Sequence, residues 1–326
     1  MSKAKVWIAE PIPCTDVAVS KLTPHAEVGV SSVFYEDIPA EKLNGLDAII
    51  VADSFLTERS LLGADSLHIV QKFGVGVNTI AIDGCSKKGI YVCNIPGINS
   101  LDVAEYAMGA MISSLRGFIR LDSAARRAAW PERPSLVGER LSGKTVGIVG
   151  FGKIGREVAR LLGPFKVKLL AYDPYVDSRA ALEKGVEMVS LRELLMESDI
   201  VTIHVPLTNE TRDLIGEEEF KQMKRSSTFI NTSRGPVVNE AALHMALSQK
   251  LIRYAVIDVW GKEPIDPDNE ILGLENAQLS LHQASWTREF FEAGMEFCAE
   301  NVIRILKGEE PLNAVNGPFD GGKARQ

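Results

Sequence analysis

Three residues in the second half of the chain have side chains suited to acid–base chemistry on a bound carboxylic acid: Arg234, Glu263 and His282. A histidine exchanges protons near neutral pH, and a neighbouring carboxylate orients its ring and favours its protonated form. The planar guanidinium of an arginine binds a carboxylate through two parallel hydrogen bonds. If the three side chains meet, they predict a site that holds an acid and moves a proton at one of its oxygens.

Each of the three residues also has a purely structural interpretation. His282 could be a hydrogen-bonded histidine, Arg234 a surface ion-pair partner, and Glu263 a solvated loop acid. Their positions favour chemistry, because each follows a short apolar segment typical of a buried strand. Open α/β sheets bind ligands at the carboxyl ends of their strands. We therefore expect a shared sheet edge, although the sequence alone does not show that the three meet.

A second chemical signal is the glycine-rich segment Gly150-Phe-Gly152-Lys-Ile-Gly155. The pattern is weak by itself, but an apolar β-branched segment precedes it and an amphipathic helix pattern follows it. In such a unit Gly150 allows the tight turn, Gly152 lets the backbone approach a pyrophosphate, and Gly155 lets the helix pack on the strand. Asp173 follows the next apolar segment and can accept hydrogen bonds from both ribose hydroxyls. Its charge would repel a 2′-phosphate, so the pattern predicts NAD rather than NADP.

Strand-like and helix-like segments alternate along most of the chain, which predicts an α/β fold with parallel sheets. Runs rich in Val and Ile are interpreted as buried strands at residues 6–9, 48–52, 69–73, 90–93, 145–149, 168–172, 200–205, 228–231, 255–259 and 278–281. Apolar residues at helical spacing predict one long helix over 102–126 and another over 287–306. Ser190 and Glu193 form a capping-box pattern, and Asn239 is expected to cap a further helix.

Several motifs resemble those of the D-isomer-specific 2-hydroxyacid dehydrogenases, the family that includes 3-phosphoglycerate dehydrogenase and hydroxypyruvate reductase. Besides the glycine-rich segment, they lie at residues 73–77, 94–99, 103–106, 198–208, 231–235, 258–259, 263–264 and 282–287. Examples are Phe-Gly-Val-Gly-Val in the first of these and Asn-Thr-Ser-Arg-Gly in the fifth. The resemblance extends from about residue 43 to residue 316, and the motifs are specific in combination.

The resemblance implies two Rossmann-like, doubly wound parallel-sheet domains. A flavodoxin-like substrate domain is expected from residues 1–101 with 288–326, and an inserted NAD-binding Rossmann domain from residues 102–287. The two long helices would connect the domains. The active site would lie in the cleft between them, and closure would exclude water. The family also implies a homodimer formed through the NAD domain, and the sequence does not separate a dimer from a tetramer.

The resemblance also implies roles for individual residues. In the reduction of a 2-oxo acid by NADH, His282 would be the general acid, Glu263 would hydrogen-bond its other ring nitrogen, and Arg234 would bind and polarise the substrate. Asp258 would lie near the nicotinamide amide. The expected substrate-binding residues are Val75 and Gly76, through their N–H groups, with Asn99, Arg234 and His282. The expected cofactor-binding residues are Gly150, Gly152, Lys153, Ile154, Gly155, Asp173, Val205, Pro206, Thr232, Ser233, Arg234, Asp258 and His282.

The substrate is left open by the sequence. In phosphoglycerate dehydrogenases an Arg-Ser pair lies near residues 51–52, where this chain has Val-Ala followed by Asp53. The missing arginine slightly favours an unphosphorylated substrate such as hydroxypyruvate or glyoxylate over 3-phosphoglycerate, although Arg59 or a basic residue of a second subunit could compensate. Trp286 could wall the substrate pocket or pack the helix start. The roles of Trp286 and of the 51–57 loop stay open.

Two further classes of protein compete with this interpretation. Some corepressors resemble the family and use NAD(H) to control assembly with partner proteins, but the extra terminal segments expected of one are missing here. Relatives that act on formate carry Gln in place of Glu263, which disfavours that substrate.

Composition and charge narrow the function classes further. The 326 residues include 45% hydrophobic and 24% charged residues, values typical of a globular protein of about two domains. The net charge of −7 argues against nucleic-acid binding as the main function. The four cysteines show no metal-ligand spacing, so we expect buried thiols in a reducing compartment and no metal site. No apolar run is long enough for a membrane span or a signal peptide, and we expect a cytoplasmic protein.

Overall fold

The computed structural model describes residues 3–182 and 185–319. The chain forms two compact units, one from residues 1–99 with 286–326 and one from residues 100–285. We call them the N/C unit and the central unit. Their boundaries lie two residues before the expected domain boundaries at both junctions, and residues 320–326 of the expected substrate domain lie outside the described residues.

A five-stranded parallel sheet forms the middle of the N/C unit, with the strand order β2-β1-β3-β4-β5. Its strands are β1 (Ala4–Ile8), β2 (Ala26–Val30), β3 (Ala48–Val51), β4 (Ile69–Lys72) and β5 (Tyr91–Cys93). The inner strands are short, wholly buried runs such as Ala-Ile-Ile-Val in β3, because helices cover both faces of a parallel sheet. This is the strand order of flavodoxin-like sheets.

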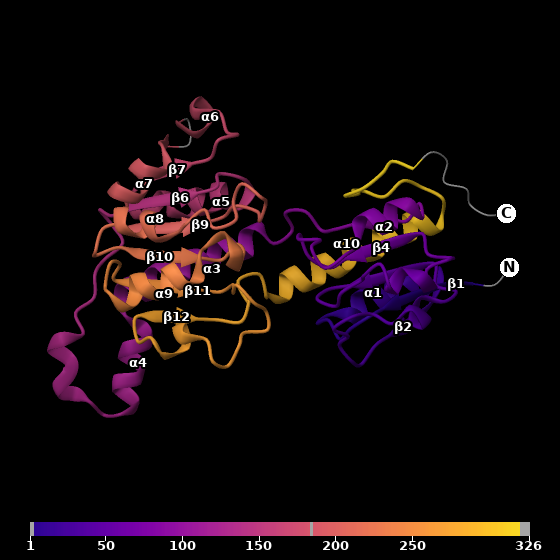
Figure 1. Cartoon of the computed structure of the whole chain (residues 1–326), viewed down its shortest axis with the longest axis horizontal. Helices are drawn as coiled ribbons and strands as arrows, with labels where there is room; N and C mark the ends of the chain where they lie inside the picture. Colours follow the sequence, from indigo (N-terminus) through magenta and orange to yellow (C-terminus); the bar gives the residue numbers. More distant parts are fainter. Residues whose placement is uncertain (1–2, 183–184, 320–326) are drawn as a thin grey trace. The chain divides into compact units, whose positions relative to one another are not determined.

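Helices cover both faces of this sheet (Figure 1). On one face lie α1 (Thr15–Leu22) and the long α10 (Arg288–Leu306), whose apolar side chains share one core with β1 and β5. On the other face lie η1 (Ala40–Leu43), η2 (Ser60–Gly63) and α2 (Ile82–Lys87). The C-terminal helix is therefore part of the same core as the first strands.

The central unit is built on a seven-stranded parallel sheet with the order β12-β11-β10-β9-β6-β7-β8. Its strands are β6 (Thr145–Val149), β7 (Lys168–Tyr172), β8 (Val186–Met188), β9 (Ile200–Ile203), β10 (Thr228–Asn231), β11 (Tyr254–Ile257) and β12 (Ala277–Leu279). The order reverses between β6 and β9, as in Rossmann sheets, with one strand added at the edge. Both sheets are parallel and doubly wound, which confirms the predicted fold class.

Two helical layers enclose the central sheet (Figure 1). One layer contains α3 (Ser100–Arg116), α5 (Lys153–Leu162) and α6 (Ser178–Leu182). The other contains α7 (Leu191–Glu197), α8 (Glu217–Gln222) and α9 (Glu240–Ser248). Shorter elements are α4 (Phe118–Arg126), η3 (Trp130–Ser135), η4 (Gly163–Phe165), η5 (Gly235–Val237) and η6 (Glu270–Gly273).

The predicted helix starts are confirmed. Ser190 and Glu193 form a reciprocal capping box at the start of α7, and the Asn239 side chain accepts a hydrogen bond from the N–H of Ala242 in α9. The predicted single helix over 102–126 is wrong. It breaks at Gly117, whose φ of 64° lies in the left-handed region, and α4 then leaves the sheet (Figure 1).

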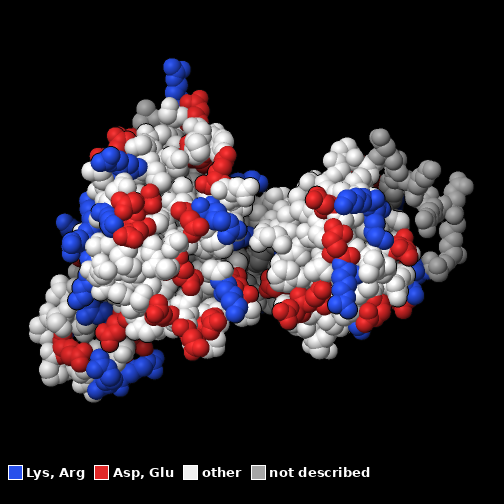
Figure 2. Space-filling view, in the orientation of Figure 1, with Lys and Arg blue, Asp and Glu red and all other residues white. Residues whose placement is uncertain are grey.

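The surface carries charges of both signs. On the face drawn in Figure 2, acidic and basic side chains stand in small mixed groups. Among the described residues, no helix is both long and apolar enough to cross a membrane.

Candidate active site

The structure brings Arg234, Glu263 and His282 to one edge of the central sheet. They follow β10, β11 and β12, which are neighbours in the sheet, so their carboxyl ends lie side by side. His282 Nδ1 lies 2.8 Å from Glu263 Oε2, and both side chains are partly exposed. The other carboxylate oxygen of Glu263 accepts the N–H of Trp260 at 3.0 Å. The carboxylate is thus fixed on one side and holds one ring nitrogen of His282, leaving Nε2 for a ligand.

The backbone of His282 is held in an uncommon conformation. Its φ of 57° lies in the left-handed region, which residues other than glycine adopt rarely and at a cost. The fully buried Asp258 stabilises this turn through hydrogen bonds. Its carbonyl accepts the His282 N–H at 2.7 Å, and its carboxylate accepts the N–H groups of Gln283 at 2.7 Å and Ala284 at 2.9 Å. Asp258 therefore fixes the direction in which His282 leaves the sheet.

Ser280 connects this turn to the surrounding helix and loop. Its hydroxyl lies 2.6 Å from Asp258 Oδ1 and 2.6 Å from the hydroxyl of Tyr106 on α3. Its carbonyl accepts the indole N–H of Trp260 at 2.9 Å. These hydrogen bonds of Ser280 restrain the segment that precedes His282.

Arg234 is presented by a turn that the preceding asparagine organises. The Asn231 side chain accepts hydrogen bonds from the Ser233 N–H at 3.0 Å and hydroxyl at 2.8 Å, and donates to the Arg234 carbonyl at 3.1 Å. A Cβ on Gly235 would lie 1.8 Å from the carbonyl oxygen of Trp260, so only glycine fits there. The sequence motif Asn-Thr-Ser-Arg-Gly is thus a turn that packs against the loop carrying Glu263.

The charges of the three side chains influence one another. Burial raises the pKa of Glu263, but the hydrogen bond and charge of His282, the Trp260 N–H and the charge of Arg234 together bring that pKa below its ordinary value. Burial lowers the pKa of Arg234, and the charge of Glu263 opposes this shift. Glu263 is therefore ionised at neutral pH and available as a hydrogen-bond acceptor for His282.

The glycine-rich segment forms the tight turn between β6 and α5. Gly150 has a φ of 93°, and a Cβ there would lie 2.7 Å from the carbonyl oxygen of His204. A Cβ on Gly155 would lie 2.2 Å from the carbonyl oxygen of Gly150, so the helix can approach the turn only with glycine. Gly152 differs, since no described atom beyond the glycine and its two chain neighbours lies within 4 Å of the position of a Cβ there. Open space at the start of α5 fits the approach of a pyrophosphate.

Asp173 follows β7 beside this turn. Its carboxylate accepts the N–H of Phe151 at 2.9 Å through one oxygen and the N–H of Tyr175 at 2.9 Å through the other. The hydroxyl of Tyr175 in turn donates to Glu210 at 2.6 Å. Each oxygen of the Asp173 carboxylate accepts one of these hydrogen bonds and has two lone pairs, so the carboxylate can accept further hydrogen bonds.

The other expected cofactor residues occupy the same sheet edge. Val205 and Pro206 follow β9, Thr232 and Ser233 follow β10, and Lys153 and Ile154 begin α5. The buried hydroxyl of Thr232 has no hydrogen-bond partner among the described residues, which fits a polar group of a bound dinucleotide at this edge. His204 is neutral, because burial lowers its pKa to about 3, and its Nε2 pairs with Thr202.

In the N/C unit the expected substrate-binding residues lie on the loop after β4. Gly74 has a φ of 141°, Val75 is 38% exposed, and the Val75 carbonyl accepts a hydrogen bond from Asn94 at 2.7 Å. Gly76 follows directly, and Asn99 lies just before α3. Because it follows β4, this loop lies at the carboxyl edge of the sheet.

The loop after β3 is held by a buried carboxylate. Glu10 accepts the N–H groups of Ala52, Asp53 and Ser54 at 2.7, 2.8 and 3.1 Å. The side chain of Asp53 itself is exposed, as is that of Arg59. The shape of this loop is thus fixed by a residue at the end of β1.

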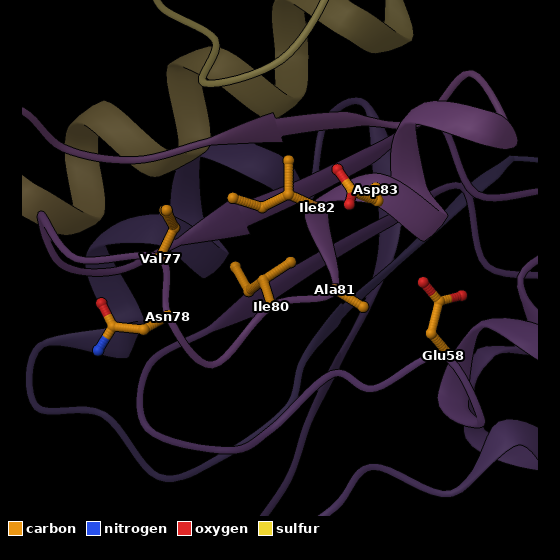
Figure 3. A pocket seen from close by; sticks show the side chains of 7 residues that line it. All are labelled: Glu58, Val77, Asn78, Ile80, Ala81, Ile82 and Asp83. Atoms are coloured by element: carbon orange, nitrogen blue, oxygen red, sulfur yellow. The ribbon is translucent and has the colours of Figure 1, made fainter. Parts of the chain in front are cut away.

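A cavity of about 510 Å³ lies beside the loop after β4 in the N/C unit (Figure 3). Its lining residues are Glu58, Val77, Asn78, Ile80, Ala81, Ile82 and Asp83. None of the expected site residues lines it, and we assign it no function.

The sequence of the central unit matches that of a known protein family. Residues 108–284, more than half of the chain, match the model of the NAD binding domain of the D-isomer specific 2-hydroxyacid dehydrogenases. The chain belongs to this family. The predicted resemblance is confirmed, and the central unit is its NAD-binding domain.

The chain is similar both to glyoxylate reductases and to D-3-phosphoglycerate dehydrogenases. The glyoxylate reductase of Korarchaeum cryptofilum is 36% identical over 327 residues, which cover 96% of each chain. The D-3-phosphoglycerate dehydrogenase of Archaeoglobus fulgidus is also 36% identical and is matched by 96% of this chain, but over only 59% of its own length. The chain thus spans about half to 60% of the length of the matched D-3-phosphoglycerate dehydrogenases of Archaeoglobus fulgidus, Methanocaldococcus jannaschii and Arabidopsis thaliana.

Solved structures support the same grouping. The D-lactate dehydrogenase of Aquifex aeolicus, solved with NAD and lactic acid, has a TM-score of 0.86 and 28% identity, covering 97% of this chain and all of that one. The NADPH-dependent glyoxylate/hydroxypyruvate reductase of Sinorhizobium meliloti has a TM-score of 0.84 and 25% identity, covering 96% and 97%. The family therefore includes proteins with different substrates and nicotinamide cofactors.

Proposed function

We propose that the protein is an NAD-dependent oxidoreductase that interconverts a small 2-oxo acid and the corresponding (R)-2-hydroxy acid. The observation that carries this proposal is the 2.8 Å contact between His282 and Glu263 in the same unit as Arg234. A histidine with one nitrogen held by a carboxylate and the other free is suited to proton transfer. Membership of the dehydrogenase family supports the same reaction type.

Each of the site residues has a different role in the proposed reaction. NADH, when bound, supplies a hydride to the carbonyl carbon of the 2-oxo acid. His282 donates a proton from Nε2 to the carbonyl oxygen and takes it back in the oxidative direction. Glu263 accepts the Nδ1–H, which sets the ring orientation and stabilises the protonated ring. In the central unit, Arg234 binds the substrate and polarises its 2-oxo group. In the N/C unit, the N–H groups of Val75 and Gly76 are the proposed binding groups for a substrate carboxylate.

The cofactor would be held by the carboxyl edge of the central sheet. Gly150, Gly152 and Gly155 shape the turn at the start of α5, where free N–H groups receive the pyrophosphate. Asp173 accepts hydrogen bonds from the ribose hydroxyls and disfavours a 2′-phosphate, so we propose a preference for NAD. The remaining proposed contacts to the dinucleotide come from Lys153, Ile154, Val205, Pro206, Thr232, Ser233, Arg234, Asp258 and His282.

The proposed substrate is unphosphorylated. The exposed loop residue Asp53 follows positions where phosphoglycerate dehydrogenases carry an arginine, and its negative charge would repel a phosphate. NADH oxidation should be followed with hydroxypyruvate, glyoxylate, pyruvate and 3-phosphohydroxypyruvate at matched concentrations. We expect kcat/KM to be about tenfold or more higher with the best unphosphorylated acid, because the Asp53 carboxylate would repel a phosphate; tenfold corresponds to about 1.4 kcal/mol.

The same assay can reject the substrate or the reaction. A preference for 3-phosphohydroxypyruvate would make the protein a 3-phosphoglycerate dehydrogenase and would overturn the interpretation of Asp53. If none of the acids is reduced and NADH changes only the oligomeric state, the protein is an NAD(H)-responsive binding protein instead.

We also propose that two copies associate through the α4 region of the central unit. Phe118, Ile119, Leu121, Trp130 and Val137 are exposed apolar residues of this segment, and such clusters mark protein–protein interfaces. Light scattering after size exclusion should give the mass of a dimer or a multiple of it. Ile119→Glu should give the monomer mass, whereas Leu62→Glu, at an exposed leucine of the N/C unit, should leave the mass unchanged. A monomeric wild type would contradict the proposal.

A further inference from the structure

Four side-chain amides form a connected chain in the N/C unit. Asn301 on α10 lies in the middle, and its Nδ2 donates both to Gln71 Oε1 at 2.9 Å and to Asn313 Oδ1 at 3.1 Å. Asn313 then donates to Asn94 Oδ1 at 2.6 Å. The Asn301 oxygen accepts the N–H of Leu312 at 2.8 Å. The chain of amides thus links β4, α10 and the segment after α10.

Both ends of this chain bind the backbone around the loop after β4. Gln71 donates to the carbonyl of Lys72 at 3.0 Å, before the loop begins. Asn94 donates to the carbonyl of Val75 at 2.7 Å, within the loop. The two carbonyls lie on either side of Gly74, whose own carbonyl accepts the N–H of Ile95 at 3.1 Å. The amides therefore hold the backbone at two points, at the last residue of β4 and within the loop that follows it.

Every amide in the chain has a defined orientation. Gln71 and Asn301 are fully buried, so each must satisfy both its oxygen and its nitrogen. Asn301 uses both hydrogens of its Nδ2, and Asn313 and Asn94 each accept on the oxygen and donate from the nitrogen. Reversing one amide would place two oxygens or two nitrogens together. A network with all groups satisfied restricts the conformation of what it holds.

The loop needs such support. Gly74 and Gly76 restrict the backbone little, and Gly74 adopts a φ of 141° that other residues rarely adopt. Val75 is exposed and has little packing to hold it. A loop of this composition samples several conformations unless hydrogen bonds restrict it.

We infer that Asn313 and Asn94 are positioning residues for substrate binding, which set the direction of the Val75 and Gly76 N–H groups through the Val75 carbonyl. This inference rests on the proposed function, in which those N–H groups bind the substrate carboxylate. The segment after α10 thereby controls affinity for the 2-oxo acid without contacting it.

Asn313→Asp tests the inference while keeping the side-chain volume and the acceptor for Asn301. The aspartate cannot donate to Asn94, so the hydrogen bond from Asn94 to the Val75 carbonyl loses its fixed orientation. We expect amide exchange in peptides that cover residues 73–78 to accelerate about fivefold, and KM for the 2-oxo acid to rise about fivefold to tenfold, as the loss of one hydrogen bond implies. The kcat value and KM for NADH should stay within about twofold, since the catalytic side chains lie on another unit.

Asn316→Ala is the matched control. Asn316 belongs to the same segment and makes three hydrogen bonds, to the Val92 N–H, the Ser86 hydroxyl and the Ile90 carbonyl, none of which lies on the loop. It should leave exchange at residues 73–78 and KM unchanged. Wild-type values in Asn313→Asp, or equal changes in the control, would overturn the inference. If the wild type reduces no 2-oxo acid, the proposed function fails, and the exchange comparison still decides whether the amides position the loop.

Discussion

Replacing His282 by asparagine should lower kcat for 2-oxo acid reduction by a factor of about 10² to 10⁴, the usual contribution of a general acid. Asparagine suits this position because it tolerates the left-handed conformation that His282 adopts at a φ of 57°. The turn held by Asp258 is thus retained, and the amide can still donate to Glu263. The amide cannot deliver a proton to the substrate oxygen. The measurement is steady-state NADH oxidation together with NADH binding by fluorescence, and the Kd for NADH should stay near the wild-type value.

His244→Asn provides a matched control for this variant. His244 lies in the same unit on α9, pairs with Glu270 at 3.6 Å and contacts Ser248, so it is also a histidine beside a glutamate. It lies outside the strand ends that carry the site, and its replacement should leave kcat unchanged. Turnover near the wild-type rate in His282→Asn would show that another group delivers the proton.

Much of the central sheet could be predicted from the sequence because buried parallel strands are simple patterns. The expected strands at 145–149, 168–172 and 228–231 have the observed bounds of β6, β7 and β10. These strands are covered on both faces, so their middle residues are mostly apolar and polar residues or glycine mark their ends. β9 ends at Ile203, two residues before the end of the strand expected over 200–205.

The elements that were missed lack this pattern. β2 (Ala26–Val30) is an edge strand that includes Glu27 and Gly29 and leaves Val30 exposed, so no apolar run identifies it. β8 (Val186–Met188) is an edge strand of the central sheet, and its middle residue is the exposed Glu187, so it too has no apolar run. The break at Gly117 was missed because a single glycine is tolerated within many helices, and the exposed Phe118 and Leu121 continued the apolar spacing.

For the candidate active site too, some features could be predicted from the sequence and others could not. The residue types and strand ends predicted a shared sheet edge for Arg234, Glu263 and His282, and the structure has them at one sheet edge. The supporting hydrogen bonds of Asp258 and Ser280 could not be predicted, since they join residues whose proximity depends on the turn around His282. The turn-forming role of Asn231 had a signal, because asparagine side chains commonly accept the N–H two residues later.

Asp173→Arg should shift cofactor preference by about 100-fold, measured as the ratio of kcat/KM with NADPH to that with NADH. The substitution removes an acceptor for the ribose hydroxyls and replaces a negative charge by a positive one. A change of about 2–3 kcal/mol is reasonable for one charge reversal beside a partly exposed phosphate. It also removes the acceptor for the Phe151 N–H in the glycine-rich turn. We therefore expect kcat/KM with NADH to fall while kcat/KM with NADPH rises.

Two further variants test whether the cofactor preference depends on the charge of residue 173 itself or on the charge of the whole segment around it. Asp173→Asn keeps one acceptor oxygen and loses the charge, so its cofactor ratio should lie between those of the wild type and Asp173→Arg. Asp177→Arg makes the same charge change at an exposed residue whose carboxylate accepts the Arg179 N–H, and should alter the ratio less than about threefold. If Asp177→Arg shifts the ratio as far as Asp173→Arg, the preference follows from the overall field of the segment. An unchanged ratio in Asp173→Arg would remove Asp173 from the ribose site altogether, because no bound ribose could then depend on its carboxylate.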